Sequence, residues 1–545
     1  MQPKMSSARN KVFVLGLDGG SWNLLRPLMD NGFMPNLQEI CEKGICATLQ
    51  STKPPYTGPA WVSSFTGVNP GKHGIFGFTT SRGESTRRSL ISSRNIRAVR
   101  LWQYLDRAGK ISGFINVPVT YPVESLNGFM ISGFLAPQEA DDITYPRDLY
   151  QNLVKELGTY IVNVKISGRV LNTEDKAFEF IDDIQFCIQK RFEALQILWQ
   201  RYAPDFLMIV FNCLDKIQHK FWKFMDIEDP LYHSTMAEKL RPRLFGVYRQ
   251  VDQIIKYIVK KLNEDTTLFI ISDHGFGPLQ KRVFINNWLK QQKLLSVKKH
   301  RAYLRKILSL MDLKKFQFSK FGIGVNTDYP VDSMIDYPKT FFYSSDVYEQ
   351  GIYFNSQAKK AKSGQIRYED EMQKIEAKIK ALTDPESGDG FVDEVRRRET
   401  VYWGPHVKQA PDLLLKMQNY GYLLNKSIPT RDNSILRAVT GPDGCHRSDG
   451  IFAAYGRNIE HAPGLEASIM DVTPTVLYTL DIALPKDLDG QPLTHIFTSE
   501  FQHKTRLRFN SEDSSVQVNA KDDTEYSKTE EREIRNRLKE LGYLD

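Results

Sequence analysis

The chain has 545 residues, of which 41% are hydrophobic and 25% are charged, and its formal net charge is +8. This composition is typical of a soluble globular protein with two or three structural units and a large core. The longest apolar runs fall far short of the roughly 18 to 20 residues that cross a bilayer, so no membrane span is expected. The N-terminal residues lead directly into a strand pattern, so no secretory signal is expected either.

The cysteines and the basic segments bear on location and partners. The five cysteines show no metal-ligand spacing, and so sparse and odd-numbered a set argues against a disulfide framework, so we expect a reducing, cytoplasmic setting. Basic residues gather at 298–306 and 314–320. Such a patch is most often a solvated helix face, although beside a cleft it would guide an anionic substrate. It does not by itself indicate binding to a nucleic-acid polymer. The oligomeric state stays open.

From residue 11 to about 290, short β-rich runs alternate with helical stretches, which is typical of an α/β protein with a mostly parallel sheet. Helices are expected where apolar residues recur at intervals of three and four. In chain order, the pattern predicts a strand at 11–17, helices at 34–43, 59–66 and 99–108, a strand at 112–116, helices at 147–156 and 175–202, a strand at 206–212, a helix at 235–262 and a strand at 266–272.

The second half of the chain is less regular. Residues 285–336 are basic and helical, so we interpret them as an insert or cap over the crevice. Alternation resumes at 340–343 and 351–354, followed by a charged helix at 367–382 and strands near 412–416 and 450–454. The predicted division is therefore a core in two parts, 1–284 and 337–497, with the insert between them and a polar tail at 498–545. The tail ends in a helix that docks by the narrow stripe Ile534, Leu538 and Leu541.

Carboxylates and imidazoles follow three of the apolar strands. Asp18 ends the first strand, Asp215 and His219 follow the third, and Asp273-His274 ends the fourth. Open α/β sheets place their sites at the carboxyl ends of strands, so these side chains are expected to share one crevice. Asp215 and His219 are four residues apart, which on a helix puts both on one face. Each motif alone also fits an ordinary turn, cap or ion pair, but together they indicate a metal site.

Two further positions fit such a site. His446 lies in a turn-rich loop that has little reason to bury an imidazole, although an exposed loop histidine is the alternative. Thr57 is placed like an N-cap before a helix whose first turn contains Pro59. A hydroxyl there faces the positive end of the helix dipole, where phosphate binds readily, and a divalent metal would activate it as a nucleophile. The alternative is that Thr57 is only a cap.

The order of these residues resembles the alkaline phosphatase superfamily, in particular its type I phosphodiesterase and nucleotide pyrophosphatase branch. The resemblance covers about 11–275 and 340–497 in outline, and 470–493 looks like the closing element of many superfamily members. It implies a three-layer α/β fold with a mostly parallel central sheet flanked by helices. The pattern that carries it is, in chain order, Asp18, Thr57-Gly58-Pro59, His73-Gly74-Ile75, Asp215 to His219, Asp273-His274 and His446.

Residue by residue, the resemblance implies two divalent metal ions, with Zn²⁺ the best fit to mixed His and Asp ligands and Mn²⁺ an alternative. One would be held by Asp215, His219 and His446. The other would be held by Asp18, Asp273 and His274, with Thr57 bridging toward it as the nucleophile that forms a phosphothreonine intermediate. The implied substrate is a small anionic phosphate ester.

Two departures from the family pattern concern the substrate. Nucleotide pyrophosphatases carry an Asn five residues after the His of His-Gly-Ile, where this chain has Phe78. Asn116 is a candidate to replace that amide, and packing is the other explanation for it. The residues after the nucleophile are also unusual, because Trp61 stands in a segment that differs from that of the pyrophosphatases and lacks the Arg of the sulfatases.

These departures leave the activity open between classes. The first hypothesis is a phosphodiesterase or nucleotide pyrophosphatase, and the second is a phosphomonoesterase or phosphomutase on the same metal core. Four segments look closer to a broad prokaryotic-type group of predicted phosphohydrolases and phosphomutases, namely 57–61, 115–122, 410–414 and 539–544. A third hypothesis is a non-catalytic binding protein that keeps the fold.

Overall fold

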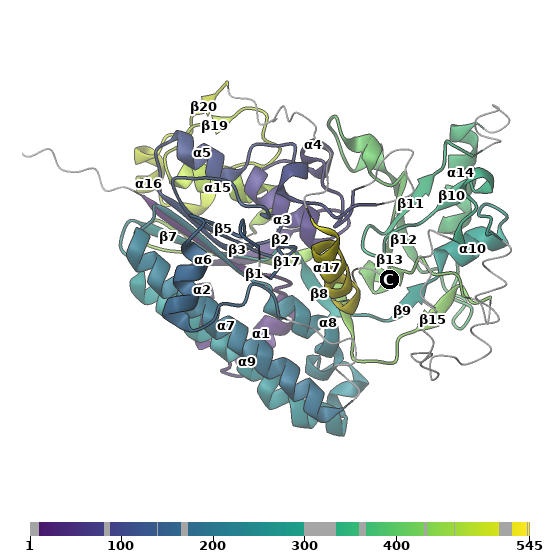
Figure 1. Ribbon diagram of the computed structural model, residues 1–545, viewed down its shortest axis with the longest axis horizontal. Helices are drawn as coiled ribbons and strands as arrows, with labels where there is room; N and C mark the ends of the chain where they lie inside the picture. Colours follow the sequence, from purple (N-terminus) through teal and green to yellow (C-terminus); the bar gives the residue numbers. More distant parts are fainter. Residues whose placement is uncertain are drawn as a thin grey trace, which may run out of the picture.

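A nine-stranded sheet runs through the larger part of the molecule in the computed structural model (Figure 1). The structure describes residues 10–80, 88–138, 140–164, 173–298, 334–358, 367–429, 433–460, 462, 464–511, 526–541 and 543. The sheet order is β18-β2-β17-β7-β1-β6-β3-β4-β5. Its strands are β1 (Lys11–Leu17), β2 (Ile45–Gln50), β3 (Ser112–Val117), β4 (Gly128–Ser132), β5 (Thr144–Tyr145), β6 (Phe206–Phe211), β7 (Thr266–Ile271), β17 (Asp449–Tyr455) and β18 (Glu466–Ser468).

The middle of this sheet is parallel and buried on both faces. Strands β7, β1, β6, β3 and β4 run parallel to one another. Strand β17 is antiparallel to both β2 and β7, and β5 is antiparallel to β4. Every residue of β3, β6 and β7 is buried. Near-continuous apolar strands are what a parallel sheet covered on both faces requires. The predicted α/β class with a mostly parallel central sheet is therefore confirmed.

Helices cover both faces of the sheet (Figure 1). Below it in this view lie α1 (Trp22–Asp30), α2 (Pro35–Lys43), α6 (Leu149–Leu157), α7 (Glu174–Tyr202) and α9 (Thr235–Lys261), and above it lie α3 (Thr57–Thr66), α5 (Leu101–Arg107), α15 (Val472–Thr479) and α16 (Ser499–Lys504). The two longest helices start at side-chain caps, because the oxygens of Thr173 and Ser234 accept hydrogen bonds from backbone N–H groups in the first turn.

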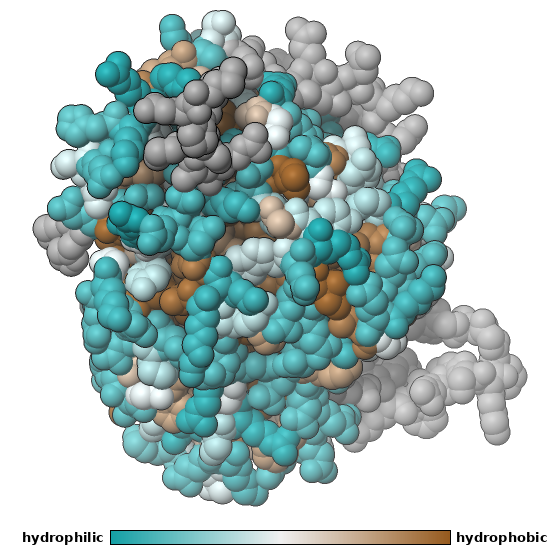
Figure 2. Space-filling model, turned by 90° about the vertical axis from the view of Figure 1, so that its left-hand side faces the viewer, coloured by the Kyte–Doolittle hydropathy of each residue, from teal (hydrophilic) through white to brown (hydrophobic). Residues whose placement is uncertain are grey.

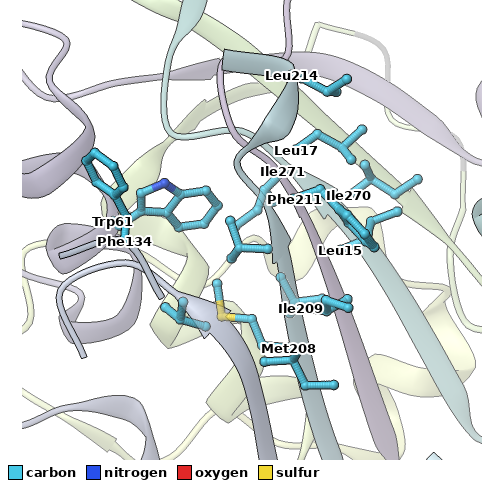
Figure 3. Packing of buried hydrophobic residues seen from close by; sticks show 14 of the residues in the cluster. Leu15, Leu17, Trp61, Phe134, Met208, Ile209, Phe211, Leu214, Ile270 and Ile271 are labelled. Carbon is cyan, nitrogen blue, oxygen red and sulfur yellow. The ribbon is translucent and has the colours of Figure 1, made fainter. Parts of the chain in front are cut away.

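The core beneath the site joins β1, β6 and β7 to helix α3. Figure 3 shows side chains of these strands packed together, with Trp61 of α3 beside them. Gly16 makes this contact possible, because a Cβ atom there would lie 2.6 Å from the Trp61 ring. The close approach brings the first turn of α3 to the carboxyl end of β1, which is where the candidate site lies.

The expected elements of the first half match the structure within a few residues. The four predicted strands are β1, β3, β6 and β7, and the six predicted helices are α2, α3, α5, α6, α7 and α9. Strands β2, β4, β5 and β18 were not predicted, because they are short or only partly buried. Helix α8 (Cys213–Met225) follows β6 and carries the predicted Asp215 and His219 pair on its first turns.

The middle of the chain forms a second unit with its own apolar core. A four-stranded sheet has the order β10 (Phe342–Tyr343), β11 (Gly351–Phe354), β13 (Leu413–Met417) and β12 (Val392–Arg397), and it packs with α10 (Ile285–Gln291) and α14 (Tyr368–Lys380). A three-stranded sheet lies beside it, with the order β14 (Tyr422–Leu424), β9 (Lys281–Val283) and β15 (Leu436–Ala438). The strands expected at 340–354 and 412–416 thus belong to this unit and not to the central sheet.

The remaining predicted segments lie at the ends of this unit and of the chain. Residues 299–333 of the predicted basic insert, with nearly all of its basic segments, and residues 512–525 of the polar tail lie outside the described residues. The boundaries at 284, 336 and 497 stay predictions. The expected C-terminal helix is α17 (Lys528–Leu541), which docks with Ile534 and Leu538 fully buried. In Figure 1 it lies, in yellow, between the central sheet and the second unit.

Shorter elements complete the description. They are α4 (Pro70–His73), β8 (Gly275–Pro278) paired with β16 (Gly444–Arg447), and β19 (Leu484–Pro485) paired with β20 (Phe509–Asn510). Short 3-10 helices lie at Ser93–Asn95, Pro230–His233, Tyr337–Lys339, Arg398–Thr400, Val407–Gln409, Gln418–Tyr420, Ile469–Asp471 and Thr494–Ile496.

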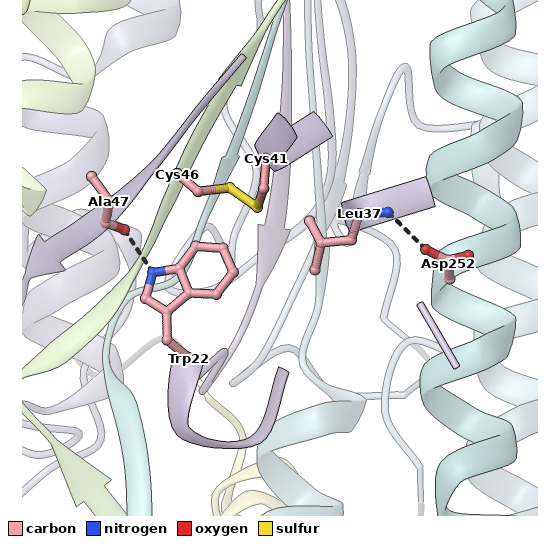
Figure 4. The surroundings of a disulfide bond; sticks show 6 residues. All are labelled: Trp22, Leu37, Cys41, Cys46, Ala47 and Asp252. Carbon is pink, nitrogen blue, oxygen red and sulfur yellow. Dashed lines mark hydrogen bonds between the residues drawn. A yellow bond between two sulfur atoms is a disulfide. The ribbon is translucent and has the colours of Figure 1, made fainter. Parts of the chain in front are cut away.

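One disulfide joins Cys41, near the end of α2, to Cys46 in β2 (Figure 4). Beside it, Trp22 Nε1 donates to the carbonyl of Ala47, and Asp252 of α9 accepts from the backbone of α2. The sequence did not predict this bond, because two cysteines five residues apart carry no distinctive spacing. Disulfides are favoured in oxidising compartments, so this bond argues against the predicted cytoplasmic setting. The setting stays a prediction.

The face shown in Figure 2 is mostly hydrophilic, with small patches of apolar side chains among the polar ones. Within the described part of the chain, every helix is too short or too polar to cross a membrane.

Candidate metal centre

Three neighbouring strands bring the predicted acidic side chains together. Strands β7, β1 and β6 lie side by side in that order and run parallel, so their carboxyl ends meet at one edge of the sheet. Asp18 follows β1, Asp215 lies in the first turn of α8 after β6, and Asp273-His274 follows β7. All four are buried. The structure therefore gathers the predicted side chains at one edge of the sheet, as expected from the strand ends.

His446 completes this cluster from a different part of the chain. It lies on strand β16, not in the expected loop, and it pairs with Phe276 of β8, next to His274. The His446 ring stacks on the His274 ring with centroids 3.5 Å apart, and its Nε2 lies 3.0 Å from Nε2 of His219. We call these six residues the metal centre: Asp18, Asp215, His219, Asp273, His274 and His446.

The three histidines of the metal centre all present Nε2 to its middle. Each Nδ1 lies beside a backbone carbonyl, at 3.3 Å from Gly444 for His219, 3.1 Å from Gly275 for His274 and 3.0 Å from Pro55 for His446. A carbonyl only accepts, so Nδ1 carries the proton and Nε2 keeps its lone pair. Burial lowers the pKa of His446 to about 4 and that of His274 well below its usual value. Both are therefore neutral at pH 7, the form that binds metals.

The three carboxylates lack the partners that buried charges need. One oxygen of each, Asp18 Oδ1, Asp215 Oδ1 and Asp273 Oδ2, is buried without a hydrogen bond. Burial, and then the neighbouring carboxylates, raise the pKa of both Asp18 and Asp273. Leaving a charge buried and unpaired costs several kcal/mol, by order of magnitude. A divalent cation would remove this cost. It would also lie between the Nε2 lone pairs of His219 and His446, which face each other without a donor between them.

Two sets of ligand atoms lie close enough to hold a metal ion. Asp215, His219 and His446 form one set, and Asp18, Asp215 and His274 form the other, with the ligand atoms of each set within 4.8 Å of one another. The first set is the one that the family resemblance implies. In the second, Asp215 stands where Asp273 was expected, although Asp273 Oδ2 lies 3.2 Å from His274 Nε2. Asp215 therefore contributes to both sets.

Thr57 lies at the start of α3 and faces the metal centre. It is the first helical residue and not the N-cap, which is Tyr56. Its hydroxyl is therefore not used as a cap. Thr57 Oγ1 lies 3.1 Å from His274 Nε2 and 3.3 Å from the hydroxyl of Tyr543. The N-terminus of a ten-residue helix favours negative charge at this point.

The two residues considered for substrate contact differ in position. Phe78 is fully buried and lies against the first turn of α3, because a Cβ atom on Gly58 would come within 3.1 Å of its ring. Asn116 donates from its amide to the carbonyl of Ser132 at 3.0 Å and accepts from the hydroxyl of Tyr160. Both ends of its amide thus make hydrogen bonds within the fold, which favours packing as the explanation for Asn116.

His73 of the His-Gly-Ile motif is a structural residue. Its Nε2 lies 3.0 Å from the Ser63 hydroxyl of α3, and its Nδ1 accepts from the backbone of Ile75. Burial lowers its pKa to about 3, so the ring is neutral. It holds the segment that carries Phe78 against α3.

Sequence reasoning missed three side chains at the metal centre. Trp61 Nε1 donates to Asp18 Oδ2 at 3.2 Å, and the hydroxyl of Tyr348 lies 3.4 Å from His219 Nδ1. Tyr543 donates to Asp215 Oδ2 at 2.8 Å. Trp61 follows Thr57 by four residues on one helix face, which is a signal that could have found it. Tyr348 comes from a distant segment whose local sequence gives no such signal. Tyr543 lies in the segment 539–544, which the family resemblance singled out without giving it a place at the site.

A mostly parallel α/β sheet with buried carboxylates and imidazoles at one edge is the arrangement of a candidate metal-dependent enzyme. Residues 12–443 match the family described as type I phosphodiesterase / nucleotide pyrophosphatase, and the chain belongs to that family. It is a hydrolase of phosphate esters. Phosphonoacetate hydrolase from Sinorhizobium meliloti 1021, solved with phosphonoformate, shares the fold at 15% identity with a TM-score of 0.51, over 87% of this chain and 95% of that one.

A second solved structure has a lower structural similarity. Murine ectonucleotide pyrophosphatase / phosphodiesterase 5, an inactive variant in complex with AMP, is 13% identical with a TM-score of 0.49. The alignment covers 90% of this chain and all (100%) of that chain. At such identities the likeness to solved structures concerns the fold, and the site must be argued from the residues of this chain.

Proposed function

We propose that this protein is a phosphodiesterase or nucleotide pyrophosphatase that acts through Thr57 at a two-metal centre. The observation that carries the proposal is the position of Thr57 Oγ1, which lies 3.1 Å from His274 Nε2 beside three carboxylates with unpaired oxygens. A nucleophile among preformed metal ligands is the arrangement that phosphoryl transfer needs. The small organic phosphate esters expected from the sequence are the proposed substrates.

The donor set suits two divalent cations, and Zn²⁺ fits its mixed nitrogen and oxygen ligands best. Asp215, His219 and His446 would hold one ion, and Asp18 and His274 would hold the other with Asp215 or Asp273. When bound, the ions would supply Lewis-acid stabilisation of the phosphoryl oxygens and lower the pKa of the attacking group. Three carboxylates against two such cations leave a local charge of +1, which favours an anionic ester.

The residues of the chain would position the reaction in two displacements. In the first, the Thr57 oxygen bonds to phosphorus as the bond from phosphorus to the leaving oxygen breaks, and the threonine proton goes to the departing alcohol. The threonine then carries the phosphoryl group with its remaining ester. In the second, water bonds to phosphorus, the bond to Thr57 breaks, and a proton of the water returns to the threonine oxygen. The N-terminus of α3 stabilises negative charge in both steps.

The surroundings of Thr57 favour a diester over a monoester. In the described part of the chain, the side chains that contact Thr57 Oγ1 are His274 and Tyr543, and neither is a permanent cation. A monoester dianion usually calls for additional cationic contacts. Phe78 stands where the nucleotide pyrophosphatases carry an amide, so it does not add to this preference. A phosphomonoesterase or phosphomutase on the same metals is the second candidate, favoured by the prokaryotic-type segments of the sequence.

The test is a matched pair of chromogenic substrates on the zinc-loaded full chain. We expect bis(p-nitrophenyl) phosphate to be turned over with a kcat/KM at least about tenfold above that of p-nitrophenyl phosphate, about 1.4 kcal/mol of selectivity. The opposite ratio would replace the diesterase by the monoesterase. A threonine-independent or metal-independent rate would show that the activity does not come from this site.

A further inference from the structure

Tyr543, which lies two residues before the last residue of the sequence, is at the centre of the candidate site. It follows helix α17 and is 1% exposed. Its hydroxyl donates to Asp215 Oδ2 at 2.8 Å and lies 3.3 Å from Thr57 Oγ1 and 3.4 Å from His219 Nε2. A side chain from the end of the chain thus contacts the nucleophile and two of the metal ligands at once.

The hydroxyl of Tyr543 occupies the place that a reacting phosphoryl group needs. In a productive complex, the attacked atom lies about 3 to 3.5 Å from the nucleophile. The Tyr543 oxygen lies at that distance from Thr57 Oγ1, on the side of the metal ligands. A phosphate ester bound beside Thr57 and Asp215 would therefore compete with the tyrosine hydroxyl for this space.

The ring of Tyr543 fills the space in front of the nucleophile. Its centroid lies 5.0 Å from Tyr348, 5.1 Å from Phe78, 5.9 Å from Phe134 and 6.2 Å from Tyr56. The imidazole rings of His219 and His446 flank it as well. An ester with an organic group of comparable size would have to take the place of this ring.

Specific contacts hold the C-terminal segment in this position. Arg537 of α17 donates to the carbonyl of Ala136 at 3.0 Å, and Tyr526 donates to the carbonyls of Ile91 and Leu135. The buried contact of α17 is narrow, since most of its side chains are polar or charged. A terminal element with few buried apolar contacts opens more easily than the core does.

We propose that the C-terminal segment is an intramolecular competitor of the substrate, with Tyr543 filling the active site in the resting chain. The proposal rests on the proposed function for the identity of the site, but the competition itself requires only binding. Linkage is reciprocal. If a bound ligand weakens the docking of Tyr543 by a certain factor, removing Tyr543 strengthens the binding of that ligand by the same factor. The segment therefore keeps the enzyme in a state of low affinity until the terminus leaves.

The first test measures how readily the terminus is released. The zinc-loaded full chain is treated with a carboxypeptidase, and the loss of terminal residues is followed by mass spectrometry with and without inorganic phosphate. We expect phosphate to increase the rate at which the carboxypeptidase removes Tyr543 about fivefold or more, because coupling between competing ligands is usually at least that large. An unchanged or slower release would overturn the proposal.

The second test uses variants of the full chain and titrates inorganic phosphate by calorimetry. Tyr543→Ala is expected to bind phosphate about fivefold or more tightly than the unmodified chain, and Tyr543→Phe by a smaller factor, because it keeps the ring. Tyr257→Ala, on α9, is the matched control and should bind phosphate as the unmodified chain does. Weaker binding by Tyr543→Ala would make the tyrosine a binding residue and overturn the proposal. Loss of a zinc equivalent in Tyr543→Phe would make it a metal ligand, with the same consequence.

The outcomes separate this proposal from the proposed function. Full turnover of diesters, together with unchanged phosphate affinity in Tyr543→Ala, would refute the competition alone. Inactivity toward all esters, together with tighter phosphate binding in that variant, would refute the proposed function alone.

Discussion

Two clusters in this molecule bury carboxylates, and they differ in whether the protein supplies hydrogen-bond partners for them. In one, which we call the paired cluster, Arg88 lies 2.7 Å from Glu349 Oε1, and the hydroxyl of Tyr353 donates to Glu349 Oε2 at 2.8 Å. Both oxygens of its carboxylate are therefore satisfied within the protein. In the metal centre, each of three buried carboxylates keeps an oxygen without a hydrogen bond.

The difference separates a structural from a functional cluster. Burying a charge is tolerated when the protein supplies its partners, and it is strongly unfavourable when it does not. The paired cluster supplies them and stabilises the junction between the two units. The metal centre does not, so we expect its stability and activity to depend on bound cations. The following predictions test this comparison, from the largest expected effect to the smallest.

Removing the nucleophile should have the largest effect. Thr57→Ala is expected to lower kcat for a chromogenic phosphodiester on the order of a thousandfold or more, because the covalent step is lost. Zinc content, measured by elemental analysis, should stay unchanged, since the ligand sets do not depend on this hydroxyl. Undiminished turnover would remove Thr57 from its role.

Breaking the paired cluster should reduce stability. Glu349→Gln leaves the Arg88 guanidinium buried without its charge partner, and we expect the free energy of unfolding to fall by about 3 to 5 kcal/mol. Denaturant titration measures this. Glu264→Gln is the matched control, because its pair with Arg457 is exposed, and it should change stability by less than about 0.5 kcal/mol. Equal effects in the two variants would show that the ion pair of the paired cluster contributes no more to the free energy of unfolding than an exposed pair does.

Removing one carboxylate of the metal centre should weaken one metal. Asp18→Ala is expected to reduce zinc affinity on the order of a hundredfold at the second ligand set, with the chelator concentration for half-removal as the measurement. Asp273→Ala decides how far that residue contributes. If Asp273→Ala loses a zinc equivalent and Asp18→Ala does not, the division implied by the ligand distances is wrong.

The smallest expected effect concerns pH. In the metal-free fold, burial and neighbouring carboxylates raise the pKa of Asp18 and Asp273. When the pKa of a carboxyl is higher in the folded than in the unfolded protein, the folded protein loses stability as the pH rises above the ordinary pKa of about 4. Zinc binds the ionised form and removes this penalty. The gap in Tm between zinc-loaded and metal-free protein should therefore widen by roughly 2 °C or more from about pH 5 to about pH 8. A constant gap would contradict the assigned shifts.

The sequence predicts the parts of this account that depend on order along the chain. Asp18 and Asp273 end apolar strands, and the parallel sheet necessarily brings such ends together. It does not predict which ligands share a metal, because Asp215 lies between both sets only in three dimensions. The short strands at 342–343 and 351–354 have the same local pattern as core strands, so their separate sheet could not be foreseen. Tyr348 and Tyr543 reach the site through tertiary packing alone.

The most direct test of the central claim is the zinc-to-protein ratio of the full chain after reconstitution and removal of free metal. If the unpaired carboxylates and facing histidines are a two-metal centre, elemental analysis should give two equivalents per chain. A chain that folds normally and retains less than one equivalent would contradict the account.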